Sequence, residues 1–297
     1  MTTAAKPAVT VRMPEGTALP LVLDSPHSGT QYPADFGHKV PLARLRHGED
    51  THVDALWADA PAHGATLIAA DFPRTYIDAN RALTDLDAAM LSGPWDEPLV
   101  PSEKSRLGVG LVWSRLGAAT PMYDRLLTPA EVRGRIERCW KPYHAALQSA
   151  IDAAVRDFGA VWHLNLHSMP NNAYERLGKT APHPLADFVL GDRDGTTCDP
   201  EFVALIEETR RAQGYRVARN DPYKGVELIA RIGQPAMRRH SLQIEIRRPI
   251  YMDEATREPN GGFAELRANL SALTREIAAY VRRRSARAHS VTSGGPP

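Results

Sequence analysis

Two apolar segments of the chain end in the same way, with a histidine followed by a serine. The first is Leu21–Gly29, in which His27 comes directly after Pro26, and the second is Val161–Pro170, which contains His167. A short apolar run that stops at Pro or Gly is typical of a buried strand that ends in a turn. The sequence therefore predicts two strands that each present an imidazole near the carboxyl end, an arrangement that suits a metal site. For either histidine alone, a hydrogen-bonded structural role is the alternative.

Strand patterns alternate with helical patterns along the chain. Strands are predicted at Pro20–Asp24, Ala65–Ala70, Ala160–Leu166, Ala186–Leu190, Tyr215–Ala218 and Ser241–Arg247. Helices are predicted at Asp50–His63, Thr128–Phe158, Asp199–Gly214 and Phe263–Tyr280. The alternation indicates a layered α/β domain. We interpret the apolar stripe of the last helix as core packing.

The whole chain, 1–297, is predicted to form a single domain, because no internal linker rich in Gly and Ser interrupts it. Residues 90–122 are rich in Pro and Gly and are interpreted as a loop-rich excursion, either a binding loop or a solvated insertion. Residues 286–297 are expected to form a disordered tail.

The charge balance gives no sign of a nucleic-acid or membrane partner. The formal net charge is +1, with 36 basic and 35 acidic residues. No apolar run approaches the roughly 18 residues that a membrane span needs, and the N-terminus lacks a secretory pattern. The two cysteines, Cys139 and Cys198, give no disulfide framework. We therefore expect a cytoplasmic protein that binds a small molecule, and the sequence leaves its oligomeric state open.

A carboxylate near the two histidines would complete a hydrolytic zinc site, which commonly has three protein ligands and a bound water. Asp50 is the preferred third ligand and Glu49 is the alternative, because both lie where a helix is predicted to begin. The competing interpretation of Asp50 is a helix N-cap. His52 is a further ligand or a neighbour of the site.

Two other groups of residues could carry chemistry. Asn80 and Arg81 follow Asp78, and an arginine fork with an asparagine beside it can bind a carboxylate. The alternative is a surface arginine paired with a nearby aspartate. Glu245 lies on the same face of a predicted strand as Gln243 and could act as a general base, or it could pair with a neighbouring arginine on a solvated face.

These motifs, taken together, resemble the N-formylglutamate amidohydrolase family, which is related to the zinc carboxypeptidase and aspartoacylase-like hydrolases. The resemblance runs from Leu21 to about Glu254. It rests on Ser25–Gly29, Asp50, Tyr76–Arg81, Arg138–His144, His167–Met169, Gly191–Thr196, Asn220–Gly225, Gln243–Glu245 and Tyr251–Glu254. No single motif decides the assignment, and their order and number make it specific.

The resemblance implies an α/β fold with a mixed central sheet flanked by helices, as in the zinc carboxypeptidase-like hydrolases. It implies one Zn²⁺ per chain, with another divalent metal as the alternative, and His27 and His167 as metal ligands. Asn80 and Arg81 resemble the pair that grips the substrate carboxylate, Arg74 resembles the arginine that polarises the scissile carbonyl, and Glu245 resembles the catalytic glutamate. Lys224 and Arg247 are assigned to the side-chain carboxylate of the substrate.

The chain departs from the related enzymes at two positions. Thr30 stands where the carboxypeptidase-type pair of His and Glu would place the glutamate, so Asp50 or Glu49 must provide the third ligand. Val226 follows Gly225 where many members are expected to have a second glycine. The implied activity is hydrolysis of an N-acyl amino acid, N-formyl-L-glutamate first, in histidine degradation. The alternatives are a deacylase of another N-acyl amino acid, a carboxypeptidase-type peptidase, and a non-catalytic amino-acid or metal-binding protein.

Overall fold

A computed structural model describes residues 7–117, 120–181 and 183–292 of the chain. The strands are β1 (Val9–Arg12), β2 (Leu21–Ser25), β3 (Thr66–Ala70), β4 (Arg115–Leu116), β5 (Thr120–Pro121), β6 (Val161–Met169), β7 (Phe188–Gly191), β8 (Val217–Arg219) and β9 (Arg239–Arg247). The helices are α1 (Leu42–Leu45), α2 (Val53–Leu56), α3 (Glu103–Arg106), α4 (Pro129–Arg135), α5 (Lys141–Phe158), α6 (Ala173–Arg176), α7 (Pro200–Ala212), α8 (Glu227–Ile232) and α9 (Phe263–Thr292). All six predicted strands are present, and β1, β4 and β5 were not predicted.

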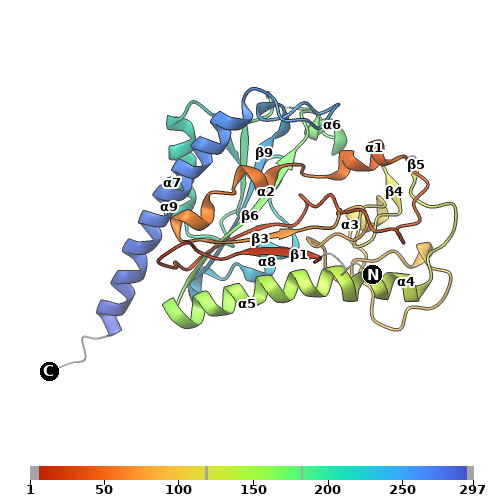
Figure 1. Ribbon diagram of the computed structural model, residues 1–297, viewed down its shortest axis with the longest axis horizontal. Coiled ribbons are helices and arrows are strands. Elements are labelled where there is room, and N and C mark those ends of the chain that lie inside the picture. The colour runs from red at the N-terminus through yellow and green to blue at the C-terminus, as the bar shows by residue number, and fades with distance from the viewer. Residues whose placement is uncertain (1–6, 118–119, 182, 293–297) are drawn as a thin grey trace, which may run out of the picture. The chain divides into compact units, whose positions relative to one another are not determined.

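Seven of these strands form one mixed sheet in the order β1-β3-β2-β6-β9-β7-β8. β6 is parallel to both β2 and β9, whereas β7 is antiparallel to β9 and parallel to β8. Figure 1 shows helices that lie next to the strands of the sheet. The predicted α/β class, with a mixed sheet flanked by helices, is confirmed.

The described chain forms two compact units, each assembled from three segments. Unit 1 comprises 7–10, 26–51 and 69–147, and unit 2 comprises 11–25, 52–68 and 148–292. The segments of the two units alternate along the sequence. The single domain expected for residues 1–297 stays a prediction.

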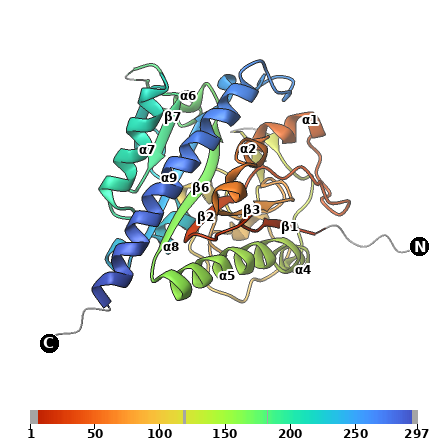
Figure 2. The ribbon, with the colours of Figure 1, turned by 60° about the vertical axis from the view of Figure 1, so that its left-hand side comes forward.

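One face of the sheet in unit 2 is covered by helices that bury apolar side chains against it. Every second residue of β6 and β9, such as Leu164 and Ile244, belongs to this core together with residues of α2, α7 and α9. Figure 2 shows α7 and α9 side by side along these strands. In the α9 stripe, Leu266, Leu270, Leu273 and Ile277 are fully buried in this core, and Phe263 packs against it. Its interpretation as core packing is therefore confirmed.

On the opposite face, the middle positions of β6 and β9 and one position of β2 carry polar side chains that are buried as well. They are Asp24 on β2, His163, Asn165 and His167 on β6, and Ser241, Gln243 and Glu245 on β9. Successive residues of a strand point to opposite faces, so the apolar packing of one set turns the polar set towards the other face. This polar face carries the residues of unit 2 that could do chemistry.

Unit 1 contains fewer regular elements and is held together by one long helical stretch and by buried polar contacts. Thr128 caps α4, and Glu131 completes the capping box that the sequence predicts. Residues Ile136–Trp140 then form a π-helical segment that leads into α5. Arg135, which is buried, donates to the carbonyl oxygens of Tyr76 and Phe36. Residues 90–122 are largely irregular, with α3, β4 and β5 as short elements.

Two expectations about helices need correction. The predicted helix 50–63 begins only at α2, because His52 before it has a left-handed backbone (φ 68°), and its second part is the separate 3-10 helix Ala60–His63, which has Pro61 in its first turn. At the other end, α9 continues to Thr292, so the expected tail from residue 286 begins within a helix, and 293–297 lie outside the described residues. No helix in the described part of the chain has the length and apolar content to cross a bilayer.

We expect Gly29→Ala to destabilise the protein. A methyl group at this position would lie 2.3 Å from the carbonyl oxygen of Phe72 and 2.6 Å from that of Ala70. Because both obstacles are backbone atoms, the free energy of unfolding should fall by about 1–3 kcal/mol, measured by urea denaturation. Gly261→Ala is the control, since no atom lies within 4 Å of its added methyl group. Equal stability of the two variants would contradict the steric argument.

Candidate metal centre

His27 follows the end of β2 and is held in unit 1 by two carboxylates. Its carbonyl oxygen accepts a hydrogen bond of 2.9 Å from the backbone N–H of Asp50. Its Nδ1 lies 3.3 Å from Asp50 Oδ2, and its Nε2 lies 2.7 Å from Asp78 Oδ1. All three side chains are buried. The imidazole is therefore fixed in one orientation, with a carboxylate on each side.

Asp78 is a buried carboxylate of unit 1 that accepts several hydrogen bonds. Its Oδ2 accepts two hydrogen bonds from Arg74, of 2.8 and 3.1 Å, and its Oδ1 also accepts one from the backbone N–H of Asn80. Burial by itself would raise the pKa of Asp78, but the nearby charges of Arg74, His27 and Arg81 lower that pKa well below its usual value. An ionised carboxylate only accepts hydrogen bonds, so Nε2 of His27 donates to Asp78, and Nδ1, which faces Asp50, is the nitrogen left for a metal.

His167 is oriented within unit 2 by a chain of buried polar side chains. Its Nε2 lies 2.7 Å from Oδ1 of Asn165, and Nδ2 of Asn165 donates to Asp24 Oδ1 over 2.9 Å. His163 Nε2 lies 2.7 Å from the same Asp24 oxygen, and its Nδ1 lies 2.7 Å from Ser241 Oγ. Because Asn165 donates its N–H to a carboxylate, its oxygen faces His167 and accepts a hydrogen bond from Nε2–H. Nδ1 of His167 therefore keeps its lone pair.

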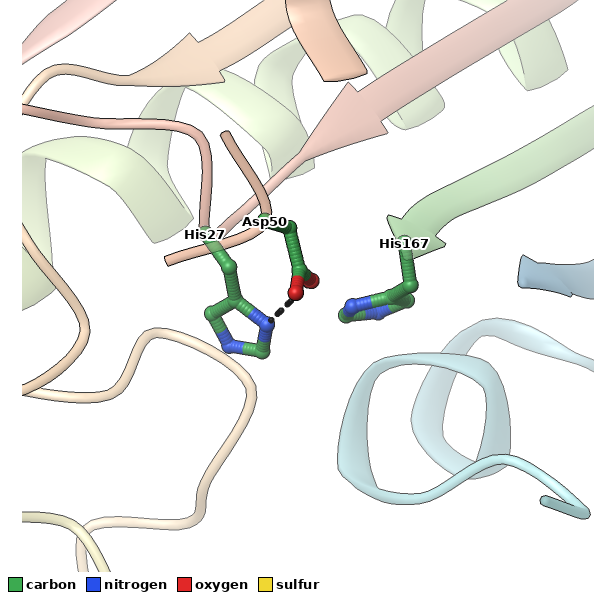
Figure 3. Close-up of side chains that lie close together, drawn as sticks. All are labelled: His27, Asp50 and His167. Atoms are coloured by element: carbon green, nitrogen blue, oxygen red, sulfur yellow. Dashed lines mark hydrogen bonds and ion pairs between the residues drawn. The ribbon is translucent and has the colours of Figure 1, made fainter. Parts of the chain in front are cut away.

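His27, Asp50 and His167 form the group in the described residues that could hold a metal ion. Each offers one ligand atom, and these atoms lie within 4.8 Å of one another. Figure 3 shows the two imidazoles and the carboxylate turned towards one another. Two imidazole nitrogens and one carboxylate oxygen are a donor set that Zn²⁺ takes in hydrolases, and each imidazole has the outer hydrogen bond that such ligands need. The residues present therefore fit a divalent metal.

Glu49 and His52, the two alternative ligands, form hydrogen bonds with groups outside the metal-binding group. Glu49 accepts hydrogen bonds from Tyr32 Oη at 2.8 Å and from Thr51 Oγ1 at 2.9 Å, and Arg46 Nε approaches it at 3.3 Å. Burial and the Glu49 charge raise the pKa of Tyr32. His52 precedes α2, and its Nε2 lies 2.8 Å from the carbonyl oxygen of Arg257. The metal-binding group thus contains Asp50, and the ligand roles themselves stay predictions.

The segment from Asp78 to Arg81 is a tight turn with its carbonyl oxygens paired. The backbone N–H of Arg81 donates to Asp78 O, and Arg81 Nη1 donates to Asn80 O over 2.9 Å. His144 Nε2 lies 2.9 Å from Ala79 O, and Trp140 Nε1 donates to Arg81 O over 3.0 Å. Trp140 ends the π-helical segment and stacks on His144, with a ring separation of 3.6 Å. The turn is therefore fixed from outside by a motif that the sequence reading left without a role.

Glu245 lies beside His167 in the sheet. The two are partners in the parallel register of β6 and β9, as are Asn165 and Gln243. Gln243 Nε2 donates to Glu245 Oε1 over 2.9 Å. Glu245 is 7% exposed, so the alternative of a solvated sheet face is wrong. Glu245 does not pair with Arg247 either, because Arg247 donates to Asp187 over 2.7 Å.

The remaining predicted site residues are engaged with other side chains. Lys224 donates to Asp194 over 2.8 Å at an exposed position, and Arg247 holds Asp187. Arg74, expected to polarise the substrate carbonyl, is an arginine paired with buried Asp78. The substrate-binding roles of Lys224, Arg247, Asn80 and Arg81 stay predictions.

The sequence did not reveal the hydrogen-bond acceptors of the two histidines, Asp78 and Asn165. The carboxylate on His27 Nε2 is Asp78, and the carboxylate of Asp24 holds His163 and Asn165. The alternation of His163, Asn165 and His167 with leucines was a signal for a polar sheet face. No local pattern links Asp78 to His27, which are 51 residues apart.

Asp78→Asn is expected to weaken zinc binding by about 10–100-fold. An asparagine offers one acceptor oxygen, whereas Asp78 accepts from His27, Arg74 and Asn80 at once. Competition with a chromogenic chelator measures the affinity, and circular dichroism checks the fold. Asp194→Asn, at an exposed carboxylate, is the control. A folded Asp78→Asn protein with unchanged zinc affinity would show that this outer hydrogen bond does not matter.

Comparison with known proteins gives a consistent result. The family model described as N-formylglutamate amidohydrolase matches residues 19–252. The N-formylglutamate deformylase of Pseudomonas aeruginosa is 30% identical over 263 residues, which cover 87% of this chain and 90% of that protein. The crystal structure of N-formylglutamate amidohydrolase from Ralstonia eutropha JMP134 is 67% identical, with a TM-score of 0.92 over 93% of this chain and 99% of that one.

A more distant structure shares the fold alone. The gene product Atu2144 from Agrobacterium tumefaciens is 18% identical, with a TM-score of 0.57 over 97% of this chain and 96% of that one. The stretch matched by the family model includes all members of the metal-binding group and Glu245.

Proposed function

The chain belongs to the N-formylglutamate amidohydrolase family, and from this premise we propose that it is a zinc-dependent amidohydrolase that converts N-formyl-L-glutamate to formate and L-glutamate. The observation that carries the proposal is the buried group of His27, Asp50 and His167. The substrate is a small molecule, and the proposed place of work is the cytoplasm, in histidine degradation.

His27, Asp50 and His167 would hold the metal, the histidines through Nδ1. A bound Zn²⁺ would lower the pKa of a coordinated water towards about 7 and polarise the formyl carbonyl. The protein contributes rigidity, because Asp78 and Asn165 fix the two imidazole rings. Another divalent ion that accepts imidazole and carboxylate ligands could take the same place.

Glu245 is the proposed general base. It takes a proton from the attacking water as the new C–O bond forms at the formyl carbon and the carbonyl π electrons move onto oxygen. The C–N bond then breaks while Glu245 returns the proton to the leaving nitrogen, which gives formic acid and the free amine; formic acid then transfers its proton to the amine and leaves as formate. Its neighbour in the register, His167, supports this assignment, since a base must lie near the water that it activates.

The turn Asp78–Arg81 and Arg74 are the proposed substrate anchors. Asn80 and Arg81 would bind the α-carboxylate, and Arg74 would stabilise the charge that develops on the carbonyl oxygen. Lys224 and Arg247 would bind the side-chain carboxylate, in exchange for the protein carboxylates that they hold in the structure. Fixing both ends of the substrate makes the attack effectively unimolecular.

The direct test is formate release per bound metal, measured beside turnover of N-acetylglutamate, N-succinylglutamate and a dipeptide. We expect N-formylglutamate to be the best substrate, a chelator to abolish turnover, and added zinc to restore it. A preference for another acyl group or for the dipeptide would replace the proposed substrate. Binding without turnover of any of them would point to a non-catalytic protein.

The ligand assignment is tested by His167→Ala. This variant should lose both bound zinc and turnover while it stays folded, because it removes one of three metal ligands. His183→Ala is the matched control at an exposed histidine and should keep both. If His167→Ala retained stoichiometric zinc and wild-type turnover, the ligand assignment would be wrong.

Glu245→Gln should keep the metal and lower kcat by about 10²–10⁴-fold, since the amide cannot take a proton from water. Zinc analysis and steady-state formate release measure the two quantities. Glu208→Gln, on the exposed side of α7, is the matched control and should change neither. Unchanged turnover of the Glu245 variant would remove this residue from the mechanism.

A further inference from the structure

We propose that Gln243 is a further residue of the active site, which holds Glu245 through its amide N–H and accepts the N–H of the scissile amide on its carbonyl oxygen. The inference rests on the proposed function, because it concerns the same reaction. It goes beyond that function by assigning a role in the recognition of amides to a side chain that has none so far.

The sheet places Gln243 at the centre of the buried polar face of unit 2. Its register partners are Asn165 on β6 and Gly191 on β7. Asn165 is the side chain that orients His167, and Glu245 follows two residues later on the same face of β9. Gln243 therefore lies next to the proposed base and to the residue that positions a proposed ligand.

The orientation of the Gln243 amide follows from its neighbour. Nε2 lies 2.9 Å from Glu245 Oε1, and an ionised carboxylate requires a donor there. The carbonyl oxygen Oε1 therefore occupies the other side of the amide plane. It is buried, and within the described residues it has no hydrogen-bond partner. Buried acceptors of this kind are rare in folded proteins, so Oε1 calls for a donor from outside the protein.

The surroundings of Gln243 hold the side chain in place. The residue is 4% exposed. On the polar face, the turn before α8 approaches so closely that a Cβ at Gly225 would lie 3.6 Å from Gln243 Cβ. Gly225 has a left-handed backbone (φ 89°), which allows this approach without a side chain. A glutamine side chain held in this way presents its amide oxygen in one direction.

The N–H of the substrate amide is the donor that the reaction brings to this place. The leaving nitrogen must come within reach of Glu245, which returns a proton to it as the C–N bond breaks. When the N–H of that nitrogen is held by Gln243 Oε1, the nitrogen lone pair can point to the protonated Glu245. The same glutamine would thus orient both the proton donor and the atom that receives the proton.

The test compares two substrates that differ in this N–H. N-formylglutamate is the amide, and the formate ester of 2-hydroxyglutarate replaces its N–H by oxygen. In Gln243→Met, the loss of the bond to Glu245 should slow both reactions, and the amide should lose at least about 10-fold more in kcat/KM than the ester. Gln148→Met, at an exposed glutamine of α5, is the matched control and should leave both values unchanged.

An equal loss on the two substrates, with zinc content and fold intact, would overturn the proposal, since Oε1 would then serve a water or the protein alone. If the variant fails to fold, the wild-type enzyme decides with N-methyl-N-formylglutamate, which has no N–H. We expect its kcat/KM to be at least about 10-fold lower, and equal turnover would overturn the proposal. A wild-type enzyme that hydrolyses neither the amide nor the ester would refute the proposed function itself.

Discussion

The buried polar face of the sheet is the constraint on which the candidate site depends. β6 and β9 each place apolar residues on one face and polar residues on the other, and both sets are buried. A shift of the register by one residue would exchange the two faces, so the apolar core of unit 2 fixes where His167 and Glu245 point. Buried polar side chains need hydrogen-bond partners, and Ser241, His163, Asp24, Asn165 and His167 provide them for one another.

The two candidate metal-binding histidines are oriented by different means. His27 donates to a carboxylate, Asp78, whose charge is balanced by Arg74. His167 donates to an amide, Asn165, and the charge of Asp24 lies one residue further away. A carboxylate acceptor makes an imidazole more basic than an amide acceptor does, so His27 should be the stronger ligand of the pair. Both arrangements leave Nδ1 as the nitrogen that can bind a metal.

The sequence predicted the parts of the fold that local patterns govern. The strand that leads to His27 and the Thr128 capping box were found because their signals lie within a few residues. The helix expected from Asp50 failed at the left-handed backbone of His52, which no composition rule foresees. Asp50 and Glu49 are adjacent, so spacing cannot separate them; the contact of Glu49 with Tyr32, 17 residues away along the chain, does. The pairing of Asp78 with His27 is likewise set by the packing of unit 1.

The turn from Asp78 to Arg81 connects two tasks that are usually considered separately. Asp78 orients a proposed metal ligand, and Asn80 and Arg81 are the proposed carboxylate anchors three residues or less away. His144 and Trp140 hold the carbonyl oxygens of Ala79 and Arg81, so both ends of the turn are fixed to the same helical stretch. A substrate carboxylate bound there would have a fixed relation to His27. The backbone of the turn would then select substrates by the separation between the α-carboxylate and the scissile carbonyl. Other residues would determine which acyl group is preferred.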